Sequence, residues 1–211
     1  VGLPIGAFYG YRVAGIFQTA EELATLPKIG SEEVGDVRYA DLNGDGVVTG
    51  DDRTYLGSPI PDLIYSFTGG FEWSGLDFAI DFVGSSGNKV YNAKQTFRFG
   101  TYNWEQRFFD RWTPENPSDT EPRITNGGHN YRVSDRFLED GSFFRLRSVV
   151  LGYSLPTSLL NNVKISRFRV YVSGLNVWTK QDYSGYSAEF PNAGNAFEVG
   201  WDFGGYPISK S

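Results

Sequence analysis

The chain has 211 residues, a formal net charge of −6, 40% hydrophobic and 17% aromatic residues, and no cysteine. An acidic balance without a basic patch argues against nucleic acid as a partner, and the lack of cysteine excludes disulfides, zinc–thiolate sites and cysteine nucleophiles from this chain. Twenty-six glycines and ten prolines indicate an all-β fold with many turns. No stretch approaches the roughly 20 apolar residues of a membrane helix.

The first part of the chain predicts a strand followed by a short helix. Residues 7–17 are rich in aromatic and β-branched residues, which is typical of a strand. Thr19 and Glu22 have the spacing of a helix capping box, and Pro27 would end the helix after about two turns.

Residues 41–52 read Asp-Leu-Asn-Gly-Asp-Gly-Val-Val-Thr-Gly-Asp-Asp, which is the oxygen-donor spacing of a calcium loop. Gly46 stands at position six, where the chain must turn sharply around the ion. Position twelve holds Asp52 in place of the usual longer Glu, which resembles the shorter loops of dockerin modules. The expected ligands of a structural Ca²⁺ are Asp41, Asn43, Asp45, the carbonyl of Val47, Thr49 and Asp52.

The charge around this loop supports a cation. Seven acids and one base lie between residues 32 and 52. The resulting local charge of −6 equals the net charge of the whole chain. Without a cation these carboxylates would repel one another. A cluster of Asx turns is the alternative, because Asn-Gly and Asp-Gly pairs form tight turns without metal. Since no good helix flanks the loop, we expect a rigid staple and not a switch.

The most informative pattern is a hairpin over residues 64–73 and 76–84, joined by the two-residue turn Ser74-Gly75. Both runs alternate with period two, and strands of roughly nine to eleven residues can cross a bilayer when tilted. The polar face would carry Glu72, Asp77 and Asp81. The apolar face would carry Tyr65, Phe67, Phe71, Trp73, Leu76, Phe78, Ile80 and Phe82.

A second strand pair is expected over residues 143–153 and 167–179. The first of these strands is irregular, because strict alternation places Arg145 and Arg147 on the same face as Val149 and Leu151. Either a β-bulge turns the side chains beyond it to the opposite face, or one face of the strand changes from polar to apolar along its length.

The connections between the expected strands alternate in length. Residues 18–63 and 85–141 are long links, whereas residues 74–75 and 154–166 are short ones. This alternation is typical of an outer-membrane barrel with long extracellular loops and short periplasmic turns. A soluble β-sandwich is the alternative, since a half-buried antiparallel sheet alternates in the same way, but shorter loops would be expected there.

At this point the sequence resembles the SusC/RagA-like TonB-dependent outer-membrane transporters of Bacteroidota. The resemblance implies that residues 1–211 form the carboxy-terminal part of a larger plugged barrel, an antiparallel transmembrane portion of about five strands. Residues 18–63 would be an extracellular loop with the calcium motif. The resemblance implies that four features of the larger transporter lie outside these residues: the signal peptide, the plug, the TonB-contacting box and the last strand. The matching phrases lie at residues 4–11, 15–18, 41–46, 56–61, 65–84, 111–117, 134–146, 151–156 and 171–176.

The resemblance implies a transporter in the bacterial outer membrane, surrounded by lipid, and not an enzyme. It would import oligosaccharides or peptides with a SusD-like surface lipoprotein, and the TonB-ExbB-ExbD complex would energise it through the plug. The polar hairpin face would look into the lumen, with Tyr65 and Trp73 near opposite membrane interfaces. The alternative is a secreted, calcium-stabilised β-sandwich that binds carbohydrate, with apolar faces that meet across a core.

Three aromatic residues of the second long link, Tyr102, Trp104 and Trp112, are candidates for stacking on sugar rings. The alternative is that they pack this link against its neighbours. The single histidine, His129, cannot form a catalytic triad or a paired metal site, and its glycine-rich surroundings predict a turn residue.

Adjacent carboxylates such as Glu32 and Glu33 do not have the separation across a cleft that glycosidase chemistry needs. Calcium ligation or solvation explains these pairs more simply. We therefore expect no catalytic residues in this chain.

Overall fold

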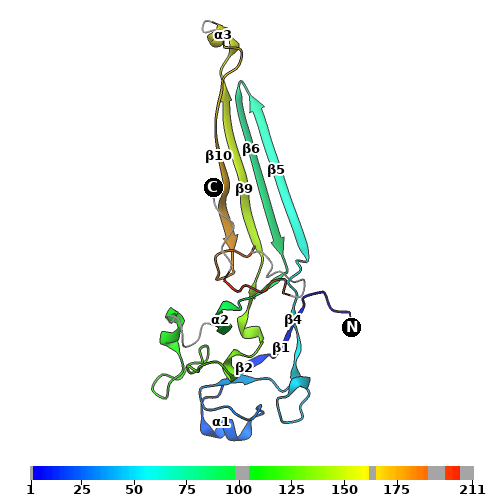
Figure 1. Cartoon of the computed structure of the whole chain (residues 1–211), viewed down its shortest axis with the longest axis vertical. Helices are drawn as coiled ribbons and strands as arrows, with labels where there is room; N and C mark the ends of the chain where they lie inside the picture. The colour runs from blue at the N-terminus through cyan, green and yellow to red at the C-terminus, as the bar shows by residue number, and fades with distance from the viewer. Residues whose placement is uncertain (1, 98–104, 162–164, 190–197, 205–211) are drawn as a thin grey trace. The chain divides into compact units, whose positions relative to one another are not determined.

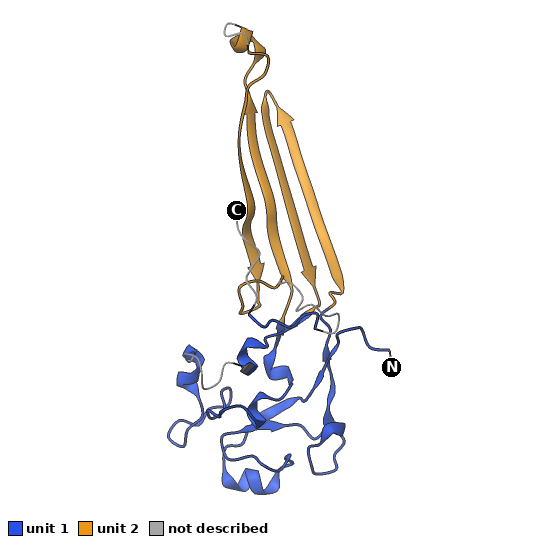
Figure 2. Cartoon of the chain, in the orientation of Figure 1, with its two compact units in different colours: residues 1–59, 89–139, 191–205 blue, residues 60–88, 140–190, 206–211 orange. Residues whose placement is uncertain are grey.

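The computed structural model describes residues 2–97, 105–161, 165–189 and 198–204. It divides into two compact units that alternate along the chain and are described separately here (Figure 2). Unit 1 comprises Val1–Pro59, Lys89–Glu139 and Pro191–Gly205, and unit 2 comprises Ile60–Asn88, Asp140–Phe190 and Tyr206–Ser211. In the described part of the chain, no helix has the length and apolar character needed to cross a membrane.

Unit 2 is built on one antiparallel sheet of four long strands in the order β10-β9-β6-β5 (Figure 1). These strands confirm both expected hairpins to within about two residues at each end. The link between the last two strands contains a single turn of helix, α3 (Thr157–Leu160). The strands are β5 (Leu63–Trp73), β6 (Leu76–Ser86), β9 (Phe143–Ser154) and β10 (Arg169–Gln181).

The turn between β5 and β6 fixes their register. Ser74 and Gly75 both have positive φ, at 51° and 87°, which is the backbone of a two-residue hairpin turn whose twist matches that of the flanking strands. Trp73 therefore lies opposite Leu76, and the pairing continues without interruption to Leu63 opposite Ser86.

One face of this sheet is apolar, as expected, and is uncovered. Phe67 lies opposite Phe82 and Phe71 opposite Phe78, yet Phe67 is 63% exposed and Trp73 is 75% exposed. On the far edge, Val172 is 67% exposed. The sandwich alternative was wrong for this sheet, because it required the apolar side chains to be buried across a core.

A β-bulge in β9 resolves the irregular strand. Asp81 of β6 pairs with Ser148, but the next residue, Phe82, pairs with Leu146, which leaves Arg147 as an extra residue. Leu146 and Val149 consequently lie on the same apolar face. Of the two interpretations that the sequence allowed, the bulge is confirmed.

Among its described residues, unit 1 contains three pairs of short antiparallel strands. The single strand expected over residues 7–17 was wrong, because this stretch forms two strands with different partners. At the break, Tyr11 N–H donates to the carbonyl of Val133, and Val13 N–H donates to the Asp135 carboxylate. The pairs are β1 (Phe8–Gly10) with β4 (Thr54–Gly57), β2 (Val13–Ile16) with β3 (Val37–Tyr39), and β7 (Lys89–Tyr91) with β8 (Leu138–Asp140).

The first helix, α1 (Ala20–Thr25), is capped as its sequence predicts. Thr19 Oγ1 accepts the Glu22 N–H, and the Glu22 carboxylate accepts the Gln18 N–H at 2.7 Å. The helix ends at Leu26, directly before Pro27. The other helical segments among the described residues of unit 1 are short: η1 (Gly50–Asp52), α2 (Lys94–Phe97), η2 (Gln106–Asp110), η3 (His129–Tyr131) and η4 (Asp135–Phe137).

The described residues of unit 1 form two small hydrophobic cores. One gathers Phe8, Tyr91, Ala93 and Phe137, and the other gathers Val37, Tyr39 and Val48. Each core joins residues from distant parts of the sequence. The described parts of the two long links are therefore not open loops but a packed body with its own interior.

Candidate functional site

The polar face of the long sheet carries ion pairs that join different strands. Asp77 of β6 bonds to Arg169 of β10 through both carboxylate oxygens, at 2.9 and 2.5 Å. The strand between them, β9, presents Gly152 opposite Asp77. A Cβ at Gly152 would lie 2.5 Å from the arginine and 2.6 Å from the carboxylate. A glycine is thus required for this pair to bridge across β9.

Further along the same face, Asp81 of β6 accepts from two strands at once. Arg147, the extra residue of the β9 bulge, lies 2.5 Å from one carboxylate oxygen, and Thr68 of β5 donates to the other at 2.9 Å. The expected grouping of acidic residues on one hairpin face is confirmed. Sequence reasoning did not predict their arginine partners, although the misfit of Arg147 in an alternating strand was the signal for them.

A third charged group, Arg145 of β9, lies near the end of this face. Its guanidinium donates to Thr179 Oγ1 at 3.0 Å and to Ser187 Oγ at 3.5 Å, and it forms an ion pair with Glu189. The arginine is only 6% exposed. This is the most deeply buried cation among the ion pairs described on the sheet.

At the Ser74-Gly75 turn, the polar face ends in a hollow of about 540 Å³. Its lining includes two acids, Glu72 and Asp77, and two bases, Arg167 and Arg169. The described part of this face therefore presents mixed charge and not one sign.

The predicted calcium loop is folded around its own carboxylates. Asp41 accepts the N–H groups of Gly44 and Gly46 at 2.7 and 2.8 Å, and Asn43 accepts that of Asp45 at 2.9 Å. Gly46 has a φ of 90°, as expected for the position-six turn. These bonds are those of Asx turns, so the backbone course fits both the calcium loop and its alternative.

Asp52 joins the two ends of this loop. Its carboxylate accepts the N–H groups of Leu42, Asn43 and Thr49, the last at 2.7 Å, and the residue is fully buried. The N–H of Thr49 is the main cause that lowers the pKa of the Asp52 carboxyl, burial opposes it, and the other two N–H groups add to it. Asp52 is thus held in its charged form.

The donor set of the loop fits a cation only in part. Within the described residues, no group of three or more His, Cys, Asp or Glu side chains is arranged to hold a metal ion. Three of the expected ligands do not belong to these residue types, namely the side chains of Asn43 and Thr49 and the carbonyl of Val47. Because a carboxylate has about four lone-pair directions, the N–H bonds to Asp41 and Asp52 leave further directions for an ion.

The acids that precede the loop have other roles. Asp36 is 1% exposed and pairs with Arg123, at 2.6 Å from its Nε. Glu32 is buried and accepts two backbone N–H groups, whereas Glu33 pairs with Arg123 on the surface. The interpretation of Glu32 and Glu33 as calcium ligands or solvated acids was wrong for Glu32.

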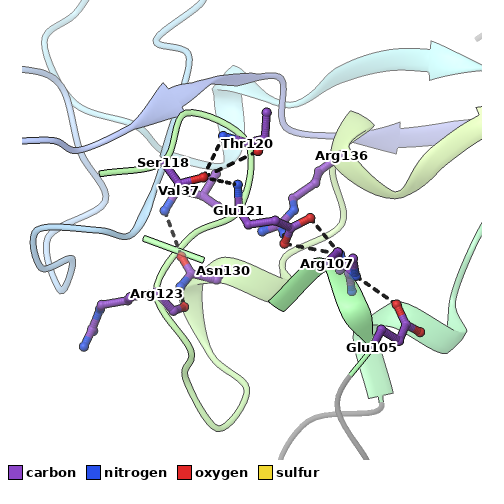
Figure 3. Close-up of polar contacts among 9 residues, drawn as sticks. All are labelled: Val37, Glu105, Arg107, Ser118, Thr120, Glu121, Arg123, Asn130 and Arg136. Atoms are coloured by element: carbon purple, nitrogen blue, oxygen red, sulfur yellow. Dashed lines mark hydrogen bonds and ion pairs between the residues drawn. The ribbon is translucent and has the colours of Figure 1, made fainter. Parts of the chain in front are cut away.

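A polar cluster in unit 1 links residues of the second long link (Figure 3). The Glu121 carboxylate lies 2.6 Å from Arg136 and 3.3 Å from Arg107. Burial lowers the pKa of Arg136, and the charge of Glu121 opposes this effect. Asn130 accepts the Val37 N–H at 2.8 Å and so closes the edge of β3.

His129 lies in a single helical turn, η3, and its ring is buried. Its Nε2 lies 2.6 Å from the Val37 carbonyl, so it must donate there, and its Nδ1 lies 3.7 Å from Glu32. The turn was predicted from the neighbouring glycines. The contacts of the ring could not be predicted, because its partners are about 90 residues away in the sequence.

Of the three aromatic candidates, the structure describes only Trp112. Trp112 is 9% exposed, its Nε1 donates to Gln18 at 3.0 Å, and its ring fills the space that a side chain at Gly35 would need. This position agrees with packing of the link. Tyr102 and Trp104 lie outside the described residues.

Comparison with known proteins decides the family. No protein-family model matches the chain. TonB-dependent receptor P26 of Formosa agariphila is 33% identical over 221 residues, which cover 100% of this chain and 22% of that protein. The chain belongs to the TonB-dependent receptors. TonB-dependent receptor P3 of the same organism is also 33% identical, over 98% of the chain and 21% of its own length.

A further relative agrees with this family, and a solved structure agrees with the fold. TonB-dependent receptor SusC of Bacteroides thetaiotaomicron is 25% identical over 72% of the chain and 15% of its own length. The RagAB peptide importer in its open-open state has a TM-score of 0.73 at 23% identity, covering 97% of the chain and 21% of the solved one. The resemblance seen in the sequence, the barrel fold and the outer-membrane location are confirmed. The chain spans about a fifth of the length of these TonB-dependent receptors.

Proposed function

We propose that the chain is the carboxy-terminal part of the barrel of a TonB-dependent outer-membrane transporter. One observation carries the proposal: a single sheet of long strands has an uncovered apolar face and an opposite face of inter-strand ion pairs. Lipid matches the first face, and a water-filled lumen matches the second. The exposed Trp73 lies at the end of the apolar face, where aromatic rings favour the membrane interface.

The full-length transporter would import oligosaccharides or peptides together with a SusD-like surface lipoprotein. The RagAB peptide importer is a structural neighbour of this chain, which supports a peptide cargo. The oligosaccharide cargo and the SusD-like partner rest on the resemblance of the sequence to the SusC/RagA-like transporters. A TonB-ExbB-ExbD complex would energise the transport through a plug. We assign this chain no catalytic role.

The test is growth and uptake in the parent bacterium after deletion of the full-length gene. Defined oligosaccharide and peptide mixtures serve as sole nutrients, and the gene is then restored on a plasmid. We expect the deletion to abolish growth on one class, and restoration to recover it. Equal growth of the deleted and restored strains on every mixture would contradict the proposal.

We also propose that residues 41–52 bind a structural Ca²⁺, with ligands from Asp41, Asn43, Asp45, Val47, Thr49 and Asp52. The spacing, the turn at Gly46 and the ionised Asp52 support this proposal. The ion would neutralise loop carboxylates and tie the loop to η1, which ends at Asp52.

The calcium proposal is tested on the purified full-length receptor by calorimetry after chelation. We expect one Ca²⁺ to bind here, and Asp45→Ala to weaken it by roughly 10-fold or more, because ligand charge sets the affinity of such loops. Asp119→Ala, which removes one acid from outside the loop, is the control. Identical calcium titrations of the two variants would exclude this site.

A further inference from the structure

The segment that follows β10 is folded back by one side chain. Gln181 donates to the carbonyls of Tyr183 and Gly185 at 3.2 and 3.0 Å, and its Oε1 accepts the Ala188 N–H at 3.1 Å. Tyr183 is 4% exposed. We call residues 182–189 the strap. Its final residues meet Arg145 of β9.

Arg145 is enclosed by oxygen atoms from two elements. Thr179 of β10 contributes a hydroxyl at 3.0 Å, and the strap contributes the Ser187 hydroxyl at 3.5 Å and the Glu189 carboxylate. The guanidinium carbon also lies 5.1 Å from the centre of the Phe143 ring. A buried guanidinium needs an anionic partner, because an unpaired buried charge is very costly.

The two partners of this ion pair are unequally exposed. The side chain of Arg145 is 7% exposed, whereas that of Glu189 is 38% exposed. Thr179 and Phe143 belong to the sheet, and they would keep Arg145 in place if the Glu189 carboxylate moved away. The acid is therefore the exchangeable partner, and the arginine is the fixed one.

We propose that Arg145, with Thr179 and Ser187, forms a binding site for an oxyanion group of the cargo, and that Glu189 fills this site until the cargo displaces it. The planar guanidinium fork suits a carboxylate or a sulfate group equally. The cargo role rests on the proposed transport function. The anion site itself can be measured without transport.

The test uses the purified full-length receptor, titrated with sodium sulfate or sodium acetate against sodium chloride at constant ionic strength. Glu189→Gln removes the internal competitor, and we expect it to raise the affinity for sulfate by about tenfold, which is the scale of one charged hydrogen bond. The matched control is Glu105→Gln. It removes the same charge from an exposed acid that is paired with Arg107 in unit 1.

Two additional variants separate binding from folding. Adding Arg145→Gln to Glu189→Gln is expected to abolish the gain, and adding the milder Ser187→Ala is expected to reduce it. Equal sulfate affinity of the Glu189→Gln, Glu105→Gln and unmodified receptors would overturn the anion site, as would a gain that survives Arg145→Gln.

The cargo role has its own readout. In cells that express Glu189→Gln, we expect the preference for anionic over neutral forms of the same cargo to change, while the Glu105→Gln strain keeps the original preference. Sulfate binding with no change in this preference would overturn the cargo role. A receptor that supports growth but shows no anion site would overturn this inference and leave the transport proposal standing.

Discussion

Glu32 and Glu33 are neighbours in the sequence but have opposite environments. Glu32 accepts the N–H groups of Ile29 and Gly30, each at 2.6 Å, and its side chain is 1% exposed. Glu33 is 71% exposed and lies beside Arg123. Burial raises the pKa of the Glu32 carboxyl, but these N–H groups and the nearby His129 outweigh it, so that its pKa lies below the ordinary value of 4.5.

This environment predicts an acid dependence of stability. Because the pKa of folded Glu32 is lowered, its contribution to stability is complete above pH 4.5 and is lost as the pH falls below that value. We expect Glu32→Gln to lower the free energy of unfolding by about 1–3 kcal/mol at neutral pH. The variant should also lose less stability than the unmodified receptor on acidification.

The measurement is thermal unfolding of the full-length receptor between about pH 6 and pH 3.5. Glu33→Gln, which removes an equal charge one residue away, should keep the original pH profile. If the Glu32→Gln profile runs parallel to the unmodified one throughout this range, the assignment to Glu32 is wrong.

At the scale of single residues, the sequence predicted positions better than partners. The two-residue hairpin turn and the common face of Asp77 and Asp81 follow from local rules that act over a few residues. The pairing of Asp77 with Arg169 spans 92 positions, and no local rule specifies it. Trp112 was likewise recognisable as an aromatic in a link, but its place against Gly35 depends on the packing of unit 1.

Strands β6, β9 and β10 are joined on their polar face by the ion pair that passes over Gly152. We expect Gly152→Ala to force this pair apart, at a cost of about 1–2 kcal/mol. In an Arg169→Ala background the same substitution should cost less, because the arginine is then absent. The free energy of unfolding of the four receptors, measured with urea, gives the coupling.

Gly50→Ala provides the control for this cycle, because nothing lies within 4 Å of a Cβ added at Gly50. Strict additivity of Gly152→Ala and Arg169→Ala would show that the glycine is not needed for the bridge.

At the scale of elements, the long strands were predictable and the short ones were not. Period-two alternation over nine or more residues is a strong signal, and it located the hairpin of β5 and β6. The strand β9 was recognised in spite of the break in its alternation at Arg147. The strands of unit 1 are three or four residues long, which is too short for a period to be recognised. The break between β1 and β2 depends on contacts with Val133 and Asp135, more than 120 residues away.

We expect a substitution by arginine to destabilise the whole receptor on the apolar face of the sheet and to have little effect on the polar face. Phe67 lies on the apolar face and Ser66 on the polar one. Phe67→Arg would place a charge in lipid, at a cost of about 2–4 kcal/mol near the bilayer midplane. We expect Ser66→Arg to cost little.

The measurement is the fraction of full-length receptor that reaches the outer membrane folded, judged by heat-dependent gel mobility. We expect a clear loss for Phe67→Arg alone. Equal yields of the two variants would show that lipid does not contact the apolar face.

At the scale of the molecule, family and fold class were predictable, but the organisation of the long links was not. Their length indicated loops, whereas the structure packs their described residues around two cores, with Asp36, Arg123 and Asn130 buried or half-buried beside them. Small cores of this kind leave no periodic trace, since each element contributes only one or two residues.

The bulge at Arg147 has a consequence for how β9 tolerates changes in length. The apolar residues before it have even numbers, Phe144 and Leu146, and those after it have odd numbers, Val149 and Leu151. The alternation of apolar residues therefore shifts by one position at the bulge. Because the extra residue, Arg147, is left out of the pairing, the apolar residues of both halves lie on the same face of the sheet. Loss of Arg147 would keep both halves in phase, whereas loss of Val150 would turn everything beyond it to the wrong side. The bulge is therefore a place at which β9 can lose one residue without reversing its faces.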